Sequence, residues 1–401
     1  MLAQVSKREL SFQEFVLILS LLMSLTALSI DAMLPALPAI GDELGVQHVN
    51  DRQLVISTLF LGLAFGQLFF GPLSDSTGRK PAMYAGFAIY IVGAVLAVLA
   101  ASFPMIIVGR LLQGVGASAP RAITLALVRD RFGGHTMARV MSFIMTVFIL
   151  VPMLAPTLGQ TVMLFAGWRA IFLALVAIAL FGLAWFALRM PETLPPERRA
   201  PFSPRRITRA VHEVITNRTA LGFTVSTGLV GGAFLGYLNS AQQIFQEQYA
   251  LGELFPVIFA VIALAIGLAS LTNTRLVLRY GLRFLVKRAL RVIVLLAAVA
   301  LGAAALTGGH PPLWFLMAYL MTSFFCVGIL FGNQNAIAME PLGHLAGVGA
   351  AVVGSLSTLI QMPLGTAIGQ GYNDTVFPLI IGMGALAALA LLVIAWAESA
   401  G

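Results

Sequence analysis

Long apolar stretches alternate with short polar segments along the whole chain. Twelve of these stretches are each long enough, at about 20 residues, to cross a bilayer as an α-helix. None has the two-residue alternation of apolar and polar positions that indicates a strand. The pattern therefore predicts an all-α membrane protein, with spans at residues 13–38, 54–72, 82–101, 104–128, 139–163, 168–188, 219–246, 254–274, 286–307, 312–338, 346–371 and 375–397.

The composition excludes a soluble protein. Hydrophobic residues form 59% of the 401 residues and charged residues 10%, whereas soluble domains contain roughly 45–50% apolar and 25% charged residues. The net charge of +8 would suggest nucleic acid as the partner of a soluble protein. Here the charges fall mainly in loops between spans, so we expect a lipid bilayer and no nucleic acid. The single cysteine, Cys326, excludes an intrachain disulfide.

The positive charges predict the orientation of the chain. Of the 24 Lys and Arg residues, 20 lie in segments on one side of the predicted spans, and only Arg52 and Arg169 lie on the other. Short loops rich in Lys and Arg stay in the cytoplasm. We therefore expect both termini to be cytoplasmic and the protein to lie in the inner membrane of a bacterium.

The longest connection, residues 191–218, is rich in proline and arginine. This composition indicates a linker on the anionic cytoplasmic leaflet, not a folded domain. It separates residues 1–190 from residues 219–401, and each part contains six predicted spans. A faint repeat places Gly281 in the second part where Gly78 stands in the first. We expect a monomer with two six-helix bundles around a central cavity.

A short polar segment, residues 71–81, joins the second and third spans. Gly71-Pro72 and Gly78 are expected to break helical continuity there. The order Gly-x-Leu-x-Asp-x-x-Gly-Arg-Lys resembles the hallmark loop of the major facilitator superfamily. We expect a cytoplasmic cluster of charges that locks one state of the transporter and breaks when the bundles rock. The residues assigned to this switch are Gly71, Asp75, Gly78, Arg79, Lys80, Arg129 and Asp130, together with Pro152 and Pro156 of the fifth span. The alternative is a solvated loop that only sets the topology.

Asp31 lies inside the first span. A charge at the centre of a span costs about 2.5–3.5 kcal/mol even on insertion scales, which makes an acid there a functional candidate. The alternative is a carboxylate that reaches water at the outer interface. Asp31 precedes the run Leu34-Pro35-Ala36-Leu37-Pro38, and the span resembles the first span of drug/proton antiporters of the bicyclomycin-resistance type. The resemblance implies that Asp31 takes part in proton coupling and substrate binding.

The fourth span contains Arg110 within a run of small residues. Its order Arg-x-x-Gln-Gly-x-Gly, which includes Gln113, resembles a second signature of the superfamily. The resemblance links Arg110 to proton transfer; the alternative is a structural arginine that ties this span to the backbone of the first. Small residues at 114 and 116–118 allow a neighbouring helix to approach closely. Arg121 lies nearer the cytoplasmic end, where it can snorkel, and we assign it no role.

The fifth span contains two prolines that bend the helix and permit close packing. Pro152 and Pro156 lie in a stretch that resembles the Gly-Pro-rich signature of exporters. The match is degenerate, because Ala155 replaces a glycine and Gln160 follows Gly159 where a second glycine is usual. With the other motifs, this resemblance favours export over uptake.

Polar and adaptable apolar residues inside the spans are the candidates for substrate binding. Ordinary helix packing is the alternative for each of them. They are Asp31, Met33, Gln113, Met145, Phe148, Tyr237, Asn239, Gln242, Asn333, Gln334, Asn335 and Gln361.

The function predicted from these features is proton-coupled export of small amphipathic drugs by alternating access, with protons as the coupling ion and no cofactor. A nutrient symporter with the same fold is the first alternative. A membrane-embedded enzyme is the second, but the sequence lacks metal-protease, Gly-x-Ser-x-Gly and nucleotide-binding motifs. We therefore expect a transporter without a metal site.

Overall fold

The computed structural model describes residues 10–399, so Lys7 and Arg8, which were counted above on the cytoplasmic side, lie outside the described residues. Within this range the chain is helical and contains no strand. Twelve helices are long and apolar enough to cross a membrane, which confirms the predicted fold class. The helices are α1 (Phe12–Asp31), α2 (Leu37–Glu43), α3 (Leu54–Thr77), α4 (Arg79–Val98), α5 (Phe103–Arg131), α6 (Gly134–Ala166), α7 (Trp168–Arg189), α8 (Pro204–Thr216), α9 (Arg218–Gln242), α10 (Phe255–Tyr280), α11 (Leu282–Leu306), α12 (Leu313–Met339), α13 (Ala346–Gln370) and α14 (Phe377–Glu398).

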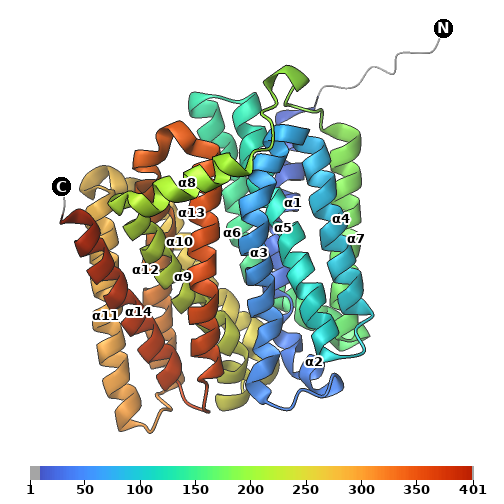
Figure 1. Cartoon of the computed structure of the whole chain (residues 1–401). Coiled ribbons are helices and arrows are strands. Elements are labelled where there is room, and N and C mark those ends of the chain that lie inside the picture. Colours follow the sequence, from blue (N-terminus) through green and yellow to red (C-terminus); the bar gives the residue numbers. More distant parts are fainter. Residues whose placement is uncertain (1–9, 400–401) are drawn as a thin grey trace.

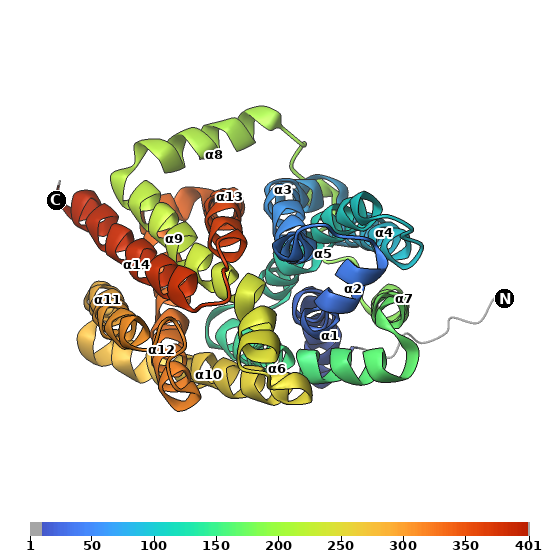
Figure 2. The same ribbon diagram turned by 90° about the horizontal axis from the view of Figure 1, so that it is seen from below.

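The spans gather in two groups, α1 with α3–α7 and α9–α14, which lie side by side in Figures 1 and 2. The first span of each group is the most enclosed, with 83% of its apolar window buried in α1 and 78% in α9. The peripheral helices α7 and α11 carry large exposed apolar side chains, such as Phe181 and Leu295. Because lipid surrounds such helices, their apolar outer faces are stable there.

Small residues set the packing of the first group. A Cβ atom on Gly114 of α5 would lie 2.1 Å from the backbone oxygen of Leu59 in α3. A Cβ atom on Gly116 would lie 2.4 Å from the backbone nitrogen of Tyr90 in α4. Only glycine therefore allows α5 to pack this closely on both neighbours, as the run of small residues predicted.

The junction between α3 and α4 is shorter than expected. The prediction that Gly71-Pro72 breaks the helix is wrong: α3 continues through Thr77, and Gly78 alone separates it from α4. A membrane helix tolerates the missing N–H of Pro72 because neighbouring helices hold it in place. Gly78 has φ +107° and Gly281 between α10 and α11 has φ +78°, so the two junctions of the faint repeat share a left-handed glycine.

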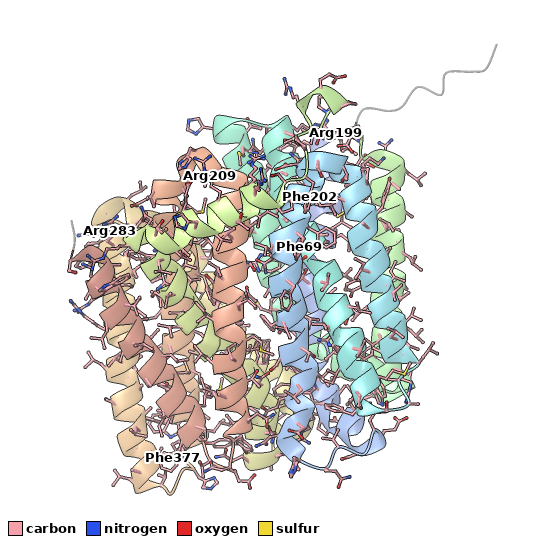
Figure 3. The ribbon with its side chains drawn as sticks, viewed as in Figure 1. Phe69, Arg199, Phe202, Arg209, Arg283 and Phe377 are labelled. Carbon is pink, nitrogen blue, oxygen red and sulfur yellow. The ribbon has the colours of Figure 1, made fainter. Side chains whose placement is uncertain are left out.

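The linker contains a helix that its composition did not reveal. Helix α8 lies beside α9 and α13 of the second group (Figures 1 and 2) and buries Ile207, Ala210 and Val214. Its arginines and those of other connections lie at the end of the molecule where the described chain starts and finishes. Figure 3 shows Arg199, Arg209 and Arg283 at this end and Phe377 at the opposite one. We call these the linker end and the far end.

Candidate functional site

The break in the first span positions Asp31. Pro35 has no N–H to donate to the carbonyl of Asp31, so α1 ends there and continues through a 3₁₀ turn, Leu34–Ala36, into α2. Helix α6 packs directly beside this break, because a Cβ atom on Gly159 would lie 2.0 Å from the backbone oxygen of Ala32. Asp31 therefore occupies the last helical position of α1, at a point where the backbone is fixed.

The Asp31 side chain has no neutralising partner. It is 4% exposed, and within residues 10–399 it makes no ion pair or side-chain hydrogen bond. Tyr237 of α9, in the other bundle, lies close enough to interact with it electrostatically. Asp31 thus lies where the two bundles face each other and not in lipid. A buried carboxyl without a counter-charge is costly in its ionised form and is suited to carry a proton.

Tyr237 is held rigidly but its hydroxyl is unpaired. The ring stacks on Phe259 with centroids 5.8 Å apart and contacts Phe324 at 4.6 Å. The hydroxyl oxygen is buried and has no hydrogen-bond partner among the described residues. Buried hydroxyls are normally satisfied, so this group is available to a ligand, to water or to Asp31.

Arg110 is buried and bonded to neutral oxygens. Its Nε donates to the Val55 carbonyl at 2.8 Å, its Nη1 to Gln113 Oε1 at 2.6 Å, and its Nη2 to the Ser29 carbonyl at 2.7 Å. These bonds join α5 to α3 and to α1, two residues before Asp31. The geometry is that of the structural alternative considered above, in which the arginine fixes the backbone next to the acid.

Orphaned polar atoms gather at the boundary between the bundles. Buried oxygens of Gln53, Asn239 and Gln242 have no partner among the described residues. The Nε2 of Gln113 is also unpaired there, but Gln113 lies within the first bundle beside Arg110. Asn239 also reaches across the boundary, because its Nδ2 donates to Ser57 Oγ at 3.0 Å. Such atoms require water or a ligand, so this boundary is the candidate binding region.

Some of the remaining predicted substrate residues hold helices together, and the others make no side-chain hydrogen bond. Asn333 exchanges hydrogen bonds with Asn273 at 2.9 and 3.0 Å, and Gln334 donates to Ser226 at 2.7 Å, so both amides tie helices within one bundle. Gln361 packs against Gly231 of α9. The others make no side-chain hydrogen bond among the described residues: Met33 is buried, Phe148 is half-buried, and Met145 and Asn335 are exposed.

At the far end a polar seal joins the bundles. Arg52 forms an ion pair with Glu247, and Gln53 donates to Gln243. Asn50 donates to the backbone oxygens of Gln370 and Tyr372, at 3.0 and 2.9 Å, and accepts from Gln243 at 2.7 Å. Sequence reasoning missed this seal, since nothing in either local sequence pairs Arg52 with Glu247. The only signal was that Arg52 is one of two basic residues on this side.

Breaking the seal should open the far end. In a Cys326→Ala background with Ser57→Cys as the labelling site, a buried position of α3 that faces the other bundle, Arg52→Ala should raise the rate of modification by a membrane-impermeant maleimide about threefold to tenfold, because an unpaired Glu247 no longer holds the bundles together. Arg169→Ala is the matched control. It removes an ion pair to Glu43 at the same end but within one bundle, and should leave the rate unchanged. Equal rates in all three proteins would contradict the seal.

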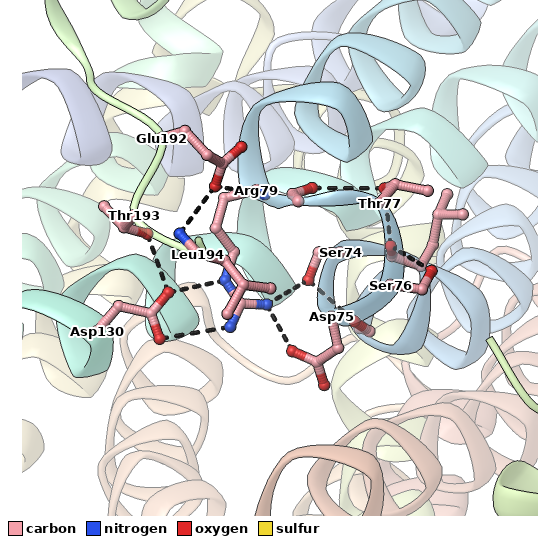
Figure 4. Close-up of polar contacts among 12 residues, drawn as sticks. Ser74, Asp75, Ser76, Thr77, Arg79, Asp130, Glu192, Thr193 and Leu194 are labelled. Atoms are coloured by element: carbon pink, nitrogen blue, oxygen red, sulfur yellow. Dashed lines mark hydrogen bonds and ion pairs between the residues drawn. The ribbon is translucent and has the colours of Figure 1, made fainter. Parts of the chain in front are cut away.

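At the linker end Arg79 is the centre of the predicted charge cluster (Figure 4). Its guanidinium is 2% exposed and binds Asp75 at 2.5 Å and Asp130 at 2.8 Å. Lys80 lies apart and donates to the backbone oxygens of Ala187 and Met190, at 2.9 and 2.8 Å. The predicted cluster therefore forms around Arg79, while Lys80 holds the end of α7.

Arg129 was expected in this cluster but does not belong to it. No ion pair joins it to the other members within the described chain. Instead Arg129 and Asp75 both approach the start of α13 in the other bundle, where a Cβ atom on Gly347 would lie 3.7 and 4.0 Å from them. Gly71 also meets α13, because a Cβ atom there would lie 3.6 Å from Ala351. Helix α3 thus stays against α13 at this end.

The two prolines of the fifth span do not interrupt it. Helix α6 runs through Pro152 and Pro156 without a break. Gly159, one turn after Pro156, packs against α1 beside Asp31, as described above. The proline-rich stretch therefore supports the acid's position by close packing.

Sequence reasoning missed Glu192, just after the sixth span, as a member of the cluster. Its carboxylate accepts from the backbone N–H groups of Arg79, Lys80 and Leu194 at 2.9 to 3.0 Å. Burial alone would raise the pKa of Glu192, but these donors and the positive charge of Arg199 outweigh burial and lower the pKa below 4.5.

The lowered pKa of Glu192 predicts that the stability it contributes depends on pH. Because the folded state favours the ionised carboxylate, Glu192 contributes its full stabilisation above pH 4.5, and the contribution disappears as the pH falls through the lower folded pKa. The difference in thermal midpoint between the wild type and Glu192→Gln should be constant at neutral pH and shrink below pH 4.5. A difference that grows in acid would contradict the assignment. Glu197→Gln, in the same linker, is the control.

Comparison with known proteins supports a transporter. The chain matches the family model described as Major Facilitator Superfamily over residues 19–365. It is 28% identical over 385 residues to the bicyclomycin resistance protein homolog of Haemophilus influenzae, with 94% of each chain covered. It is also 28% identical over 381 residues to the chloramphenicol resistance protein of Pseudomonas aeruginosa, with 88% of this chain and 85% of the relative covered. Its fold matches the solved human organic anion transporter MFSD10 with TM-score 0.73 at 18% identity, covering 96% and 99% of the two chains.

Proposed function

Because this chain belongs to the Major Facilitator Superfamily and is a membrane transporter, not an enzyme, we propose that it exports small amphipathic drugs in exchange for protons. The observation that carries the proposal is the buried, unpartnered Asp31 between the bundles, close to Tyr237. A group that loses a proton on one side of the membrane and gains one on the other needs this placement. The names of the two resistance relatives support drugs as the cargo class.

The proposed cycle uses the two ends of the molecule in turn. With the linker end in the cytoplasm, the structure has its outer side sealed by Arg52 and Glu247. In this state Asp31 releases its proton inward and drug binds between the bundles. Rearrangement then breaks the seal, a proton from outside neutralises Asp31, and drug leaves. The cluster around Arg79 stabilises the complementary, outward-facing state when α13 moves closer to Asp75 and Arg129, which it already approaches here.

The energy available to one proton is adequate for modest accumulation. One pH unit supplies about 1.4 kcal/mol, and a membrane potential of 100 mV supplies about 2.3 kcal/mol for each net charge moved. One exchanged proton therefore supports a drug gradient of roughly tenfold to several hundredfold. The proposed location is the bacterial inner membrane, with both termini in the cytoplasm, and a monomer is sufficient for the cycle.

The accumulation of radiolabelled chloramphenicol in cells tests both the direction of transport and its coupling to protons. Cells that produce the protein should accumulate less label than cells with the empty vector, and a protonophore should abolish the difference. Higher accumulation that a protonophore also abolishes would favour uptake by proton symport and overturn the export proposal. A difference that persists in the protonophore would remove protons from the mechanism.

A further inference from the structure

Arg121 is a second charged side chain inside a span, and the cycle above does not use it. It lies ten residues, about 15 Å, before the linker end of α5. Its Cα–Cβ bond points toward the start of the helix and away from the nearer membrane surface. Yet the side chain is exposed, and it makes no hydrogen bond or ion pair in the part of the chain that the structure describes. An unpaired guanidinium at this depth needs water or a ligand as its partner.

The contacts of α5 show which way Arg121 faces. Ala117 meets α1, since its carbonyl accepts from Thr26 Oγ1 at 3.1 Å, and Ser118 packs on α3. Gly116 meets α4 on the other side of the helix. Arg121 follows Ala117 by four residues and Ser118 by three, so it projects between these two directions. In Figure 2 the interval between α1 and α3 is the side of α5 that faces the other bundle.

Arg110 provides an internal comparison. The two arginines are eleven residues apart, which is about three turns, so they share one face of α5. All three nitrogens of the Arg110 guanidinium are bonded to protein oxygens, whereas Arg121 has no such bond. Asp31 cannot serve Arg121 as counter-charge. Thr26 of α1 and Ala117 of α5 lie at the same level, because they are hydrogen-bonded. Asp31 lies five residues from Thr26 toward the far end, and Arg121 lies four residues from Ala117 toward the linker end. The two side chains therefore start about 13 Å apart along the helices.

We propose that Arg121 binds an anionic group, above all a carboxylate, on the transported molecule. A guanidinium presents paired N–H donors that match a carboxylate, and residues 10–399 supply no carboxylate to occupy them. The cargo would then be small amphipathic acids whose apolar body extends from Arg121 toward Tyr237 and Asp31. This inference rests on the proposed function, because it names the class of substrate for the same path.

One consequence concerns charge movement. If a monoanion leaves while one proton enters, each cycle moves two elementary charges in the same electrical sense. Export of acids would therefore respond more steeply to membrane potential than export of neutral drugs.

Binding to the purified protein in nanodiscs tests the assignment without any need for transport. The probes are nalidixate, which carries a carboxylate, its neutral methyl ester, and the cation ethidium, each measured by isothermal titration. The wild type should bind nalidixate about tenfold more tightly than the ester. Arg121→Gln should weaken the binding of nalidixate about tenfold and leave the affinity for the ester unchanged, while Arg121→Lys should retain part of the preference for the acid.

Arg275→Gln is the control, because it removes an exposed arginine at the linker end of another span. It should bind all three probes as the wild type does. Equal wild-type affinity for acid and ester, no nalidixate binding, or a uniform loss of all probes in Arg121→Gln would overturn the proposal. If the protein prefers nalidixate to its ester but does not lower the accumulation of chloramphenicol, the anion site stands and only the proposed export function is overturned.

Discussion

Replacement of Asp31 by Asn should abolish proton-coupled transport without loss of stability. The amide has nearly the same shape as the acid but cannot release a proton, so drug-driven proton release in proteoliposomes should fall about tenfold or more, to background. Asp31 has no partner to lose within the described chain, and its buried charge is costly. The thermal midpoint should therefore stay the same or rise.

Asp42→Asn is the matched control, because Asp42 follows in the same span but is exposed. It should retain proton release. Asp31→Glu should keep part of the activity, since it preserves the titratable group at a slightly different position. Normal proton release in Asp31→Asn would remove this residue from the coupling mechanism. A large fall in thermal midpoint would show that the carboxyl has a structural partner.

Replacement of Arg110 by Lys should have the largest effect on stability. A single ammonium group cannot reach the Val55 carbonyl, Ser29 carbonyl and Gln113 together as the planar guanidinium does. Hydrogen bonds to charged groups contribute about 1.5–3 kcal/mol each, so the loss of one or two should cost about 2–4 kcal/mol. Proton release should fall as well, because Ser29 lies two residues before Asp31 and fixes its position.

The measurement is thermal unfolding in nanodiscs followed by tryptophan fluorescence, together with the proton-release assay. Arg131→Lys is the control on the same helix. Among the described residues its side chain makes one hydrogen bond, to the Leu10 carbonyl at 3.3 Å, and lies over the Phe15 ring at 5.3 Å. Lysine keeps the charge that faces the ring, so a change of less than about 1 kcal/mol is expected. An unchanged midpoint with lost proton release would indicate that Arg110 acts through its charge and not through the bonds described here.

Much of the architecture could be predicted because the bilayer imposes it. Only helices satisfy their backbone groups in hydrocarbon, so twelve long apolar runs already define twelve spans. The glycines of the fourth span predicted its close packing, and the likeness of Gly78 and Gly281 predicted two similar junctions. Gly71-Pro72 misled the prediction because proline is tolerated in a membrane helix that neighbours support.

The pairing of polar residues could not be predicted. The seal joins residues almost two hundred positions apart, such as Arg52 and Glu247, and nothing in either local sequence indicates the other. The same holds for Asn333, whose partner Asn273 makes it a packing residue. Glu192 was overlooked because its role depends on backbone N–H groups that reach it only through the fold.

The sequence by itself determined the number of spans, the asymmetry of positive charge and the few residues that carry charge into the membrane. These properties follow from local hydrophobicity and from the cost of charge in hydrocarbon. Only the tertiary structure decided which of those charges are neutralised, since neutralisation depends on what other helices bring near. It gave Arg110 three oxygens and left Asp31 and Arg121 without a hydrogen-bond or ion-pair partner among the residues it describes, and on that difference the proposed roles depend.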